Sequence, residues 1–159
     1  MLISVSKNKR IIEIISDSIE KTLEIGKKIG ELLESEKVVC FTGPLGSGKT
    51  TLIKGIAAGF GAVSPARVNS PTFVMVNEYQ GRLAIFHIDA YRINSIAEFE
   101  ALGFEEFIGP ESVVLIEWAD KVAPALKGLD CINIQMRHNG AESRIISISG
   151  LKNAHLLSK

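Results

Sequence analysis

The stretch Gly43-Pro44-Leu45-Gly46-Ser47-Gly48-Lys49-Thr50 decides the fold of this chain. It matches the pattern G-x-x-x-x-G-K-[S/T], which is typical of a phosphate-binding loop between a strand and a helix. At average residue frequencies, the pattern arises by accident in on the order of 0.5% of chains of this length. A glycine-rich turn that only joins a strand to a helix would require neither the lysine nor the threonine, so phosphate binding is the preferred interpretation.

Each position of this loop has a separate chemical role in the prediction. Its glycines allow positive φ, so that the backbone N–H groups surround an anion at the positive end of the next helix. Lys49 is expected to approach the β- and γ-phosphates of ATP, and the Thr50 hydroxyl is placed to bind Mg²⁺. The whole loop, together with Thr51 at the α-phosphate, is predicted to hold the nucleotide (ATP or ADP).

The neighbouring residues supply the strand and the helix that such a loop needs. Residues 38–42 form an apolar run, which predicts a strand that is covered on both sides. Residues 50–60 predict a helix that ends at glycines. Residues 19–33 predict another helix with one apolar stripe, for which Ser16, Asp17 and Ser18 offer N-cap side chains.

The remaining pattern alternates between strands and helices. Strands are expected at 10–15 and 113–116, hairpins at 73–79 with 82–88 and at 131–136 with 144–148, and a short helix at 94–102. The tail from Lys152 is short enough to fray. We therefore predict an α/β fold, the three-layer fold of P-loop NTPases: a mainly parallel sheet flanked by helices, with antiparallel hairpin additions, as one domain of residues 1–159.

Composition and charge narrow the class of protein. The 159 residues are 46% hydrophobic, and 18 basic residues balance 18 acidic ones. Zero net charge argues against a protein that coats DNA or RNA, which would be basic. Cys40 and Cys131 lie in apolar runs and are expected to be buried; their spacing indicates neither a disulfide framework nor a metal site.

The chain shows no sign of a membrane or secretory destination. The first residues lack the apolar stretch of a secretory signal, and no apolar run reaches the ~18 residues of a membrane span. We expect a cytoplasmic protein without membrane contact.

Two acids follow apolar strands and are candidates for the magnesium site. Asp89 follows residues 83–88, and Glu117 follows residues 113–116. Ligands of an open α/β sheet lie beyond the carboxyl ends of its strands, so both acids are expected to face the phosphates. One could bind Mg²⁺ while the other orients the attacking water, and the sequence leaves their order open. Capping of a helix is the alternative for either acid.

Three nearby residues are compatible with more than one role. His87 lies within an apolar run, and a buried, hydrogen-bonded histidine is the preferred interpretation. Trp118 adjoins Glu117; core packing is the default, and its position also suits a nucleotide contact. Arg92 is compatible with a surface charge, an acid partner or a phosphate contact.

The motifs, taken together and in order, resemble the TsaE family, whose members are P-loop ATPases of bacterial tRNA threonylcarbamoyladenosine synthesis. After the loop 43–51, the likeness rests on Ser70-Pro-Thr-Phe73, His87-Ile-Asp-Ala-Tyr-Arg92, Glu100-Ala-Leu-Gly103 and Glu117-Trp118. It covers nearly the whole chain and is looser beyond Trp118. The P-loop occurs in many families, whereas the other motifs at these spacings are far more specific.

The resemblance implies roles that the residues alone do not settle. Thr50 and Glu117 would bind Mg²⁺, and Asp89 would be needed for ATP hydrolysis, with Lys49 as the third catalytic residue. Thr72 would lie in a switch-like loop, while Ser18 and Asp120 would help to shape the base pocket. The partners would be TsaB and TsaD, with tRNA contacted only through them, and slow ATP hydrolysis would drive turnover of that assembly.

Two other functions share the loop. A small-molecule kinase would also need an arginine-rich lid, for which residues 92–107 are too short and acidic. A nucleotide-sensing adaptor would bind ATP or ADP and scarcely hydrolyse it. The sequence does not determine the oligomeric state.

Overall fold

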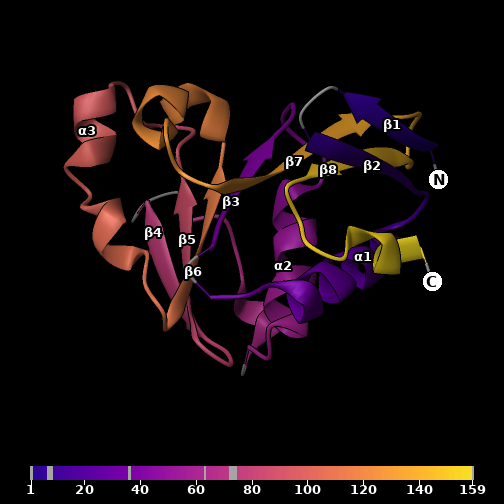
Figure 1. Ribbon diagram of the computed structural model, residues 1–159, viewed down its shortest axis with the longest axis horizontal. Coiled ribbons are helices and arrows are strands. Elements are labelled where there is room, and N and C mark those ends of the chain that lie inside the picture. The colour runs from indigo at the N-terminus through magenta and orange to yellow at the C-terminus, as the bar shows by residue number, and fades with distance from the viewer. Residues whose placement is uncertain (1, 7–8, 36, 63, 72–74, 159) are drawn as a thin grey trace.

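A computed structural model describes residues 2–6, 9–35, 37–62, 64–71 and 75–158 and shows one mixed sheet with helices on both sides (Figure 1). The eight described strands lie in the order β1-β2-β8-β7-β3-β6-β5-β4. Their bounds are Leu2–Ser6 (β1), Lys9–Ser16 (β2), Lys37–Thr42 (β3), Val76–Gln80 (β4), Ala84–Asp89 (β5), Ser112–Glu117 (β6), Cys131–His138 (β7) and Arg144–Ser149 (β8).

The helices differ greatly in length. The two long ones are α1 (Ile19–Leu32) and α2 (Lys49–Gly59); α3 (Ile96–Glu100) is shorter than predicted. The 3-10 segments are η1 (Pro65–Arg67), η2 (Phe104–Phe107), η3 (Ala119–Leu126) and η4 (Ala154–Ser158). None of the helices in the described residues is both long enough and apolar enough to cross a membrane.

The centre of the sheet is parallel and its flanks are antiparallel. Strands β7, β3, β6 and β5 run in the same direction, whereas β4 and the group β8, β2 and β1 add antiparallel ladders. Both predicted hairpins are confirmed, although Phe73 and Val74 of the first one lie outside the described residues. A mainly parallel sheet is a wrong prediction for the whole, because four of the seven ladders are antiparallel. The prediction did not include β1, nor the pairing of β2 with β8 that adds β1 and β2 to one side of the sheet.

Alternation along the central strands builds two cores. In β3, Val39 and Phe41 belong to the core under α1 and α2, while Val38 and Cys40 pack with α3, η2 and η3 on the other side. The predicted two-sided burial of this strand is therefore confirmed. Cys40 and Cys131 are both buried, also as predicted.

The start of α1 follows one of the predicted caps. Ser18 is the N-cap, and its hydroxyl accepts a hydrogen bond of 3.1 Å from the backbone N–H of Lys21. At the other end of the chain, η4 places Leu157 in the core with only 6% of its surface exposed. The tail therefore packs onto the domain, and the prediction that it frays is wrong.

Helices α1 and α2 pack closely because glycines line their contact. A Cβ built on Gly26 would lie 2.9 Å from the Cα of Gly55, and one on Gly59 would lie 1.9 Å from the carbonyl oxygen of Lys27. Glycine inside a helix costs about 1 kcal/mol relative to alanine, so close approach is what these positions gain. This contact fixes the direction of α2, and with it the position of the loop that precedes α2.

We predict that Gly59→Ala lowers the free energy of unfolding by about 1–3 kcal/mol, because the added methyl group overpacks backbone that has no room to move. Chemical denaturation measures the change. Gly109→Ala is the matched control, since its Cβ would meet only the Ser112 Oγ at 4.0 Å. Equal stability of the two variants would contradict this account of the helix contact.

Candidate functional site

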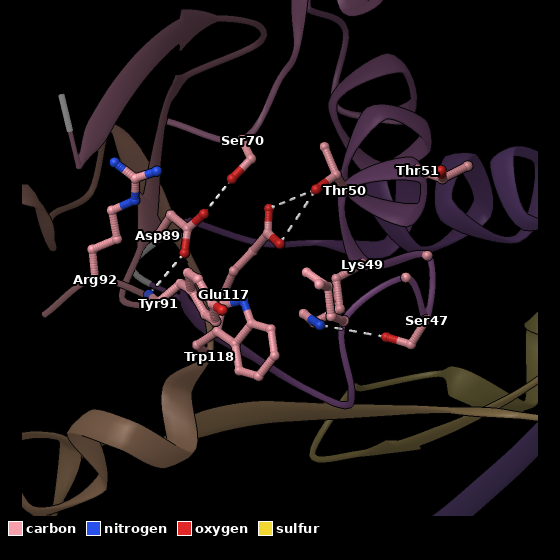
Figure 2. A pocket seen from close by; sticks show the side chains of 13 residues that line it. Ser47, Lys49, Thr50, Thr51, Ser70, Asp89, Tyr91, Arg92, Glu117 and Trp118 are labelled. Atoms are coloured by element: carbon pink, nitrogen blue, oxygen red, sulfur yellow. Dashed lines mark hydrogen bonds between the residues drawn. The ribbon is translucent and has the colours of Figure 1, made fainter. Parts of the chain in front are cut away.

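A pocket of about 450 Å³ lies beyond the carboxyl ends of β3, β5 and β6 (Figure 2). Residues from the loop, the first turn of α2 and the ends of the strands line it: Leu45, Gly46, Ser47, Gly48, Lys49, Thr50, Thr51, Ser70, Asp89, Tyr91, Arg92, Glu117 and Trp118. The sequence thus correctly predicted the edge of the sheet at which polar groups collect.

The loop between β3 and α2 has the backbone that the glycines predicted. Gly43, Gly46 and Gly48 have φ of 141°, 74° and 97°. At Gly43 a Cβ would also lie 2.3 Å from the carbonyl oxygen of Met136, so the neighbouring strand β7 forbids a side chain there. Gly48 is the N-cap of α2 and has no side chain to cap the first turn, which leaves the N–H groups of that turn for a ligand.

Lys49 is a nearly buried cation that is held by the loop itself. Its Nζ donates to the carbonyl oxygens of Gly43 at 2.8 Å and Pro44 at 3.0 Å, and lies 4.1 Å from the ring centroid of Trp118. Burial lowers the pKa of Lys49, and the carboxylates of Glu117, Asp89 and Asp120 act in the opposite direction. The side chain is therefore a charge held in place with little water around it.

Glu117 connects three elements of the structure. Its carboxylate accepts from the Thr50 hydroxyl at 3.1 and 3.3 Å and lies 2.8 Å from Nε2 of His87. The side chain of Glu117 is 4% exposed, and that of His87 is fully buried. The prediction of a buried, hydrogen-bonded histidine is confirmed; that its partner would be Glu117 was not foreseen.

Asp89 joins two loops at the same pocket. One carboxylate oxygen accepts from the Ser70 hydroxyl, and the other accepts from the backbone N–H of Tyr91 at 2.9 Å. The second contact closes a local turn, whereas the alternative weighed for this residue was capping of a helix. Glu117 differs, because its hydrogen bonds come from side chains of other elements rather than from a helix start.

Trp118 has a backbone conformation that is rare for a bulky residue. Its φ of 58° lies in the left-handed region. This bend places the indole over Lys49, while the ring of Tyr91 lies 4.9 Å from it. Figure 2 shows the indole between the lysine and the end of β5. The conformation thus serves the pocket rather than the core alone.

Some predicted residues lie elsewhere. Gly43 and Pro44 contact Lys49 from behind the pocket lining. Ser18 caps α1, and Asp120 lines a separate pocket of about 300 Å³ with Cys40 and Cys131, so neither lines the main pocket. Thr72 lies outside the described residues.

Three lining residues were not among the predicted site residues: Ser70, Tyr91 and Arg92. Two signals could have found them. Ser70 begins the Ser-Pro-Thr-Phe segment, and Tyr91 and Arg92 directly follow Asp89.

The oxygen atoms at the pocket suit Mg²⁺ that is bound together with a nucleotide better than a metal ion that is held by protein ligands alone. Thr50 and Glu117 present hard oxygen donors about one hydrogen bond apart, and among the described residues no group of three or more His, Cys, Asp or Glu gathers as a metal cluster. Mg²⁺ bound with a nucleotide typically takes one or two protein oxygens, and phosphate and water complete its shell. The residues present fit that arrangement.

Known proteins are similar to this chain in both sequence and fold. Residues 16–146 match the family described as threonylcarbamoyl adenosine biosynthesis protein TsaE. The tRNA threonylcarbamoyladenosine biosynthesis protein TsaE of Treponema pallidum is 38% identical over 112 residues, which cover 70% of this chain and 82% of that protein. Its counterpart from Bacillus subtilis is 34% identical over 137 residues, covering 86% and 84%.

A solved structure agrees with these matches. The crystal structure of Bacillus subtilis YdiB superposes with a TM-score of 0.70 at 26% identity and covers 96% of this chain and 95% of its own. The family match includes every residue that lines the pocket, and the fold match covers nearly the whole chain. This chain belongs to the TsaE family of tRNA threonylcarbamoyladenosine biosynthesis proteins.

Proposed function

We propose that the chain is a P-loop NTPase that binds ATP with Mg²⁺ in the 450 Å³ pocket. One observation carries the proposal: a glycine loop with positive φ, an uncapped helix start and a buried lysine face two carboxylates across one pocket. The amides and the lysine suit a polyanion, and the carboxylates suit the cation that accompanies it. The anion-binding groups and the carboxylates face the same pocket, as a nucleotide with a bound cation requires.

The residues divide the work between phosphate and metal. Lys49 exchanges its contacts with the loop carbonyls for the β- and γ-phosphates, and the first turn of α2 directs its N–H groups to the same atoms. Thr50 and Glu117 hold Mg²⁺, which neutralises charge between the phosphates when it is bound. Asp89 orients the attacking water, and its contact with Ser70 joins it to the switch-like loop.

We propose that the nucleobase lies beyond the α-phosphate, which Thr51 contacts. Ser18, at the start of α1, contributes to the base pocket together with Thr72 and Asp120, and Trp118 forms a side wall.

Family membership supports a role in installing threonylcarbamoyl on adenosine in tRNA. We propose that the chain works there with TsaB and TsaD in the cytoplasm and contacts tRNA only through them. Within the described residues, Arg92 is the one arginine that lines the pocket, and it lies on the same side as Asp89. Arg144 donates to the carbonyl oxygen of Gly46 in the phosphate loop at 3.4 Å. We propose slow hydrolysis in isolation that the partners raise.

We predict that Lys49→Met weakens Mg·ATP binding roughly 10- to 150-fold, the effect of losing charge-assisted hydrogen bonds to phosphate. The variant should still fold, and its free energy of unfolding is measured as well, because the substitution also removes the hydrogen bonds from Nζ to the carbonyl oxygens of Gly43 and Pro44. Calorimetric titration and chemical denaturation measure the two quantities. Lys54→Met removes a lysine of the same helix outside the pocket and serves as the control. ATP affinity that is unchanged in Lys49→Met would refute the assignment.

We predict that Asp89→Ala lowers phosphate release in the presence of TsaB and TsaD about 100-fold or more, because a residue that orients water contributes at least that much. ATP binding should persist. Glu111→Ala, an exposed acid before β6, is the control.

Two results would point to the other functions. Phosphate release at background level in the full assembly of the wild-type chain would favour the adaptor. ATP consumption that depended on a small acceptor and on no protein partner would favour the kinase.

A further inference from the structure

We infer that His87 is a positioning residue that fixes the Glu117 carboxylate from behind and couples it, through Tyr79, to the segment at Asn69 and Ser70. The inference rests on the proposed function, because it concerns how the Mg²⁺ ligand of that site is held. It goes further by assigning a role to a buried histidine that does not itself line the pocket.

The position of His87 in the sheet makes this contact possible. Strand β5 lies between β6, which ends at Glu117, and β4, which carries Asn77 and Tyr79. The register pairs His87 with Leu115 on one neighbour and with Asn77 on the other. His87 therefore shares with Glu117 and Tyr79 the face that is covered by α2, where no part of its side chain is exposed.

Both ring nitrogens have a partner on a different strand. Nε2 lies 2.8 Å from Oε1 of Glu117, and Nδ1 lies 3.4 Å from the hydroxyl of Tyr79. Since a carboxylate only accepts, Nε2 carries the proton of the shorter contact. A histidine needed only for packing would be satisfied by any backbone carbonyl, whereas this one meets the carboxylate that also contacts Thr50.

The hydrogen bonds of the Glu117 carboxylate indicate that His87 orients it. Oε1 accepts from both His87 and the Thr50 hydroxyl, whereas Oε2 lies 3.3 Å from the Thr50 hydroxyl. If the Thr50 oxygen binds a cation, the hydrogen bond from His87 would still hold Glu117, whether or not the Thr50 hydroxyl continued to donate to it. Hydrogen bonds of this kind orient ligating groups, and their loss typically costs about 10- to 100-fold in metal affinity.

The same ring reaches the loop on the other side. The Tyr79 hydroxyl lies 3.1 Å from the carbonyl oxygen of Asn69, and the Asn77 amide donates to that oxygen at 3.3 Å. The next residue, Ser70, donates to Asp89. One hydroxyl proton of Tyr79 thus has two acceptors, the His87 ring and the Asn69 carbonyl, which ties the loop to the carboxylate.

Two amide variants separate the functional role from packing. In His87→Gln the amide nitrogen has the reach of Nε2, and in His87→Asn it has the reach of Nδ1. Calorimetry of ATP binding at increasing Mg²⁺, and with EDTA, gives the half-saturating Mg²⁺ concentration and the metal-free affinity. We expect His87→Gln to behave like the wild type and His87→Asn to need about 10- to 100-fold more Mg²⁺, with metal-free ATP affinity unchanged in both.

Each outcome decides the inference. Equal Mg²⁺ requirements of the two amide variants, or equal losses of metal-free affinity, would overturn it. Thermal melting checks the fold, and should His87→Asn fail to fold, His87→Met fills the space without a donor and takes its place. A wild-type chain that bound no ATP with or without Mg²⁺ would refute the proposed function itself, which is a different result.

The coupling to the loop has its own test in the nucleotide-free protein. Tyr79→Phe keeps the ring and removes the hydroxyl, so amide hydrogen exchange at Asn69 and Ser70 should become roughly fivefold faster, the effect of one lost hydrogen bond. The Mg²⁺ requirement should stay within about twofold of wild type, because the Glu117 contact remains. Unchanged exchange would refute the coupling, whether or not ATP binds.

Discussion

The turn from β3 into α2 constrains everything around it. The chain turns from β3, at the centre of the sheet, into α2, and β7 pairs with β3 beside this turn. A Cβ at residue 43 would lie 2.3 Å from the carbonyl oxygen of Met136 in β7. Glycine fits at residue 43 because it has no Cβ, and Gly46 and Gly48 adopt the positive φ that the loop requires. The amides that a helix start leaves unpaired are consequently gathered at one place instead of being capped.

Burial of charge follows from that geometry. Lys49 begins α2 and has nowhere to extend except across the loop, so its ammonium binds the loop carbonyls and lies over the indole of Trp118. The carboxylates of Glu117 and Asp89 come from the two strands next along the sheet. Opposite charges near a cavity, with few water molecules between them, favour a ligand that carries both signs, such as a nucleotide with its divalent cation.

The two sides of the pocket are held in different ways: helix packing fixes the lysine and threonine, whereas hydrogen bonds hold the two acids. The glycine-lined contact of α1 with α2 leaves no space for movement of the helix that carries Lys49 and Thr50. The acids are held differently, by hydrogen bonds to Ser70, Tyr91, Thr50 and His87 that a ligand could exchange. Membership of the TsaE family places the chain in the synthesis of a tRNA modification.

The sequence by itself determined the local features, because these depend on residue type and spacing. Glycine at 43, 46 and 48, the cap at Ser18, both hairpins and the two acids at strand ends all follow from short-range rules, and the structure bears them out. Only the tertiary structure decided how the strands join, and it made β1 and the packed tail part of the domain. It also decided that Glu117 meets His87 across two strands. Such contacts depend on which segments become neighbours in space, and no local pattern in the chain encodes that choice.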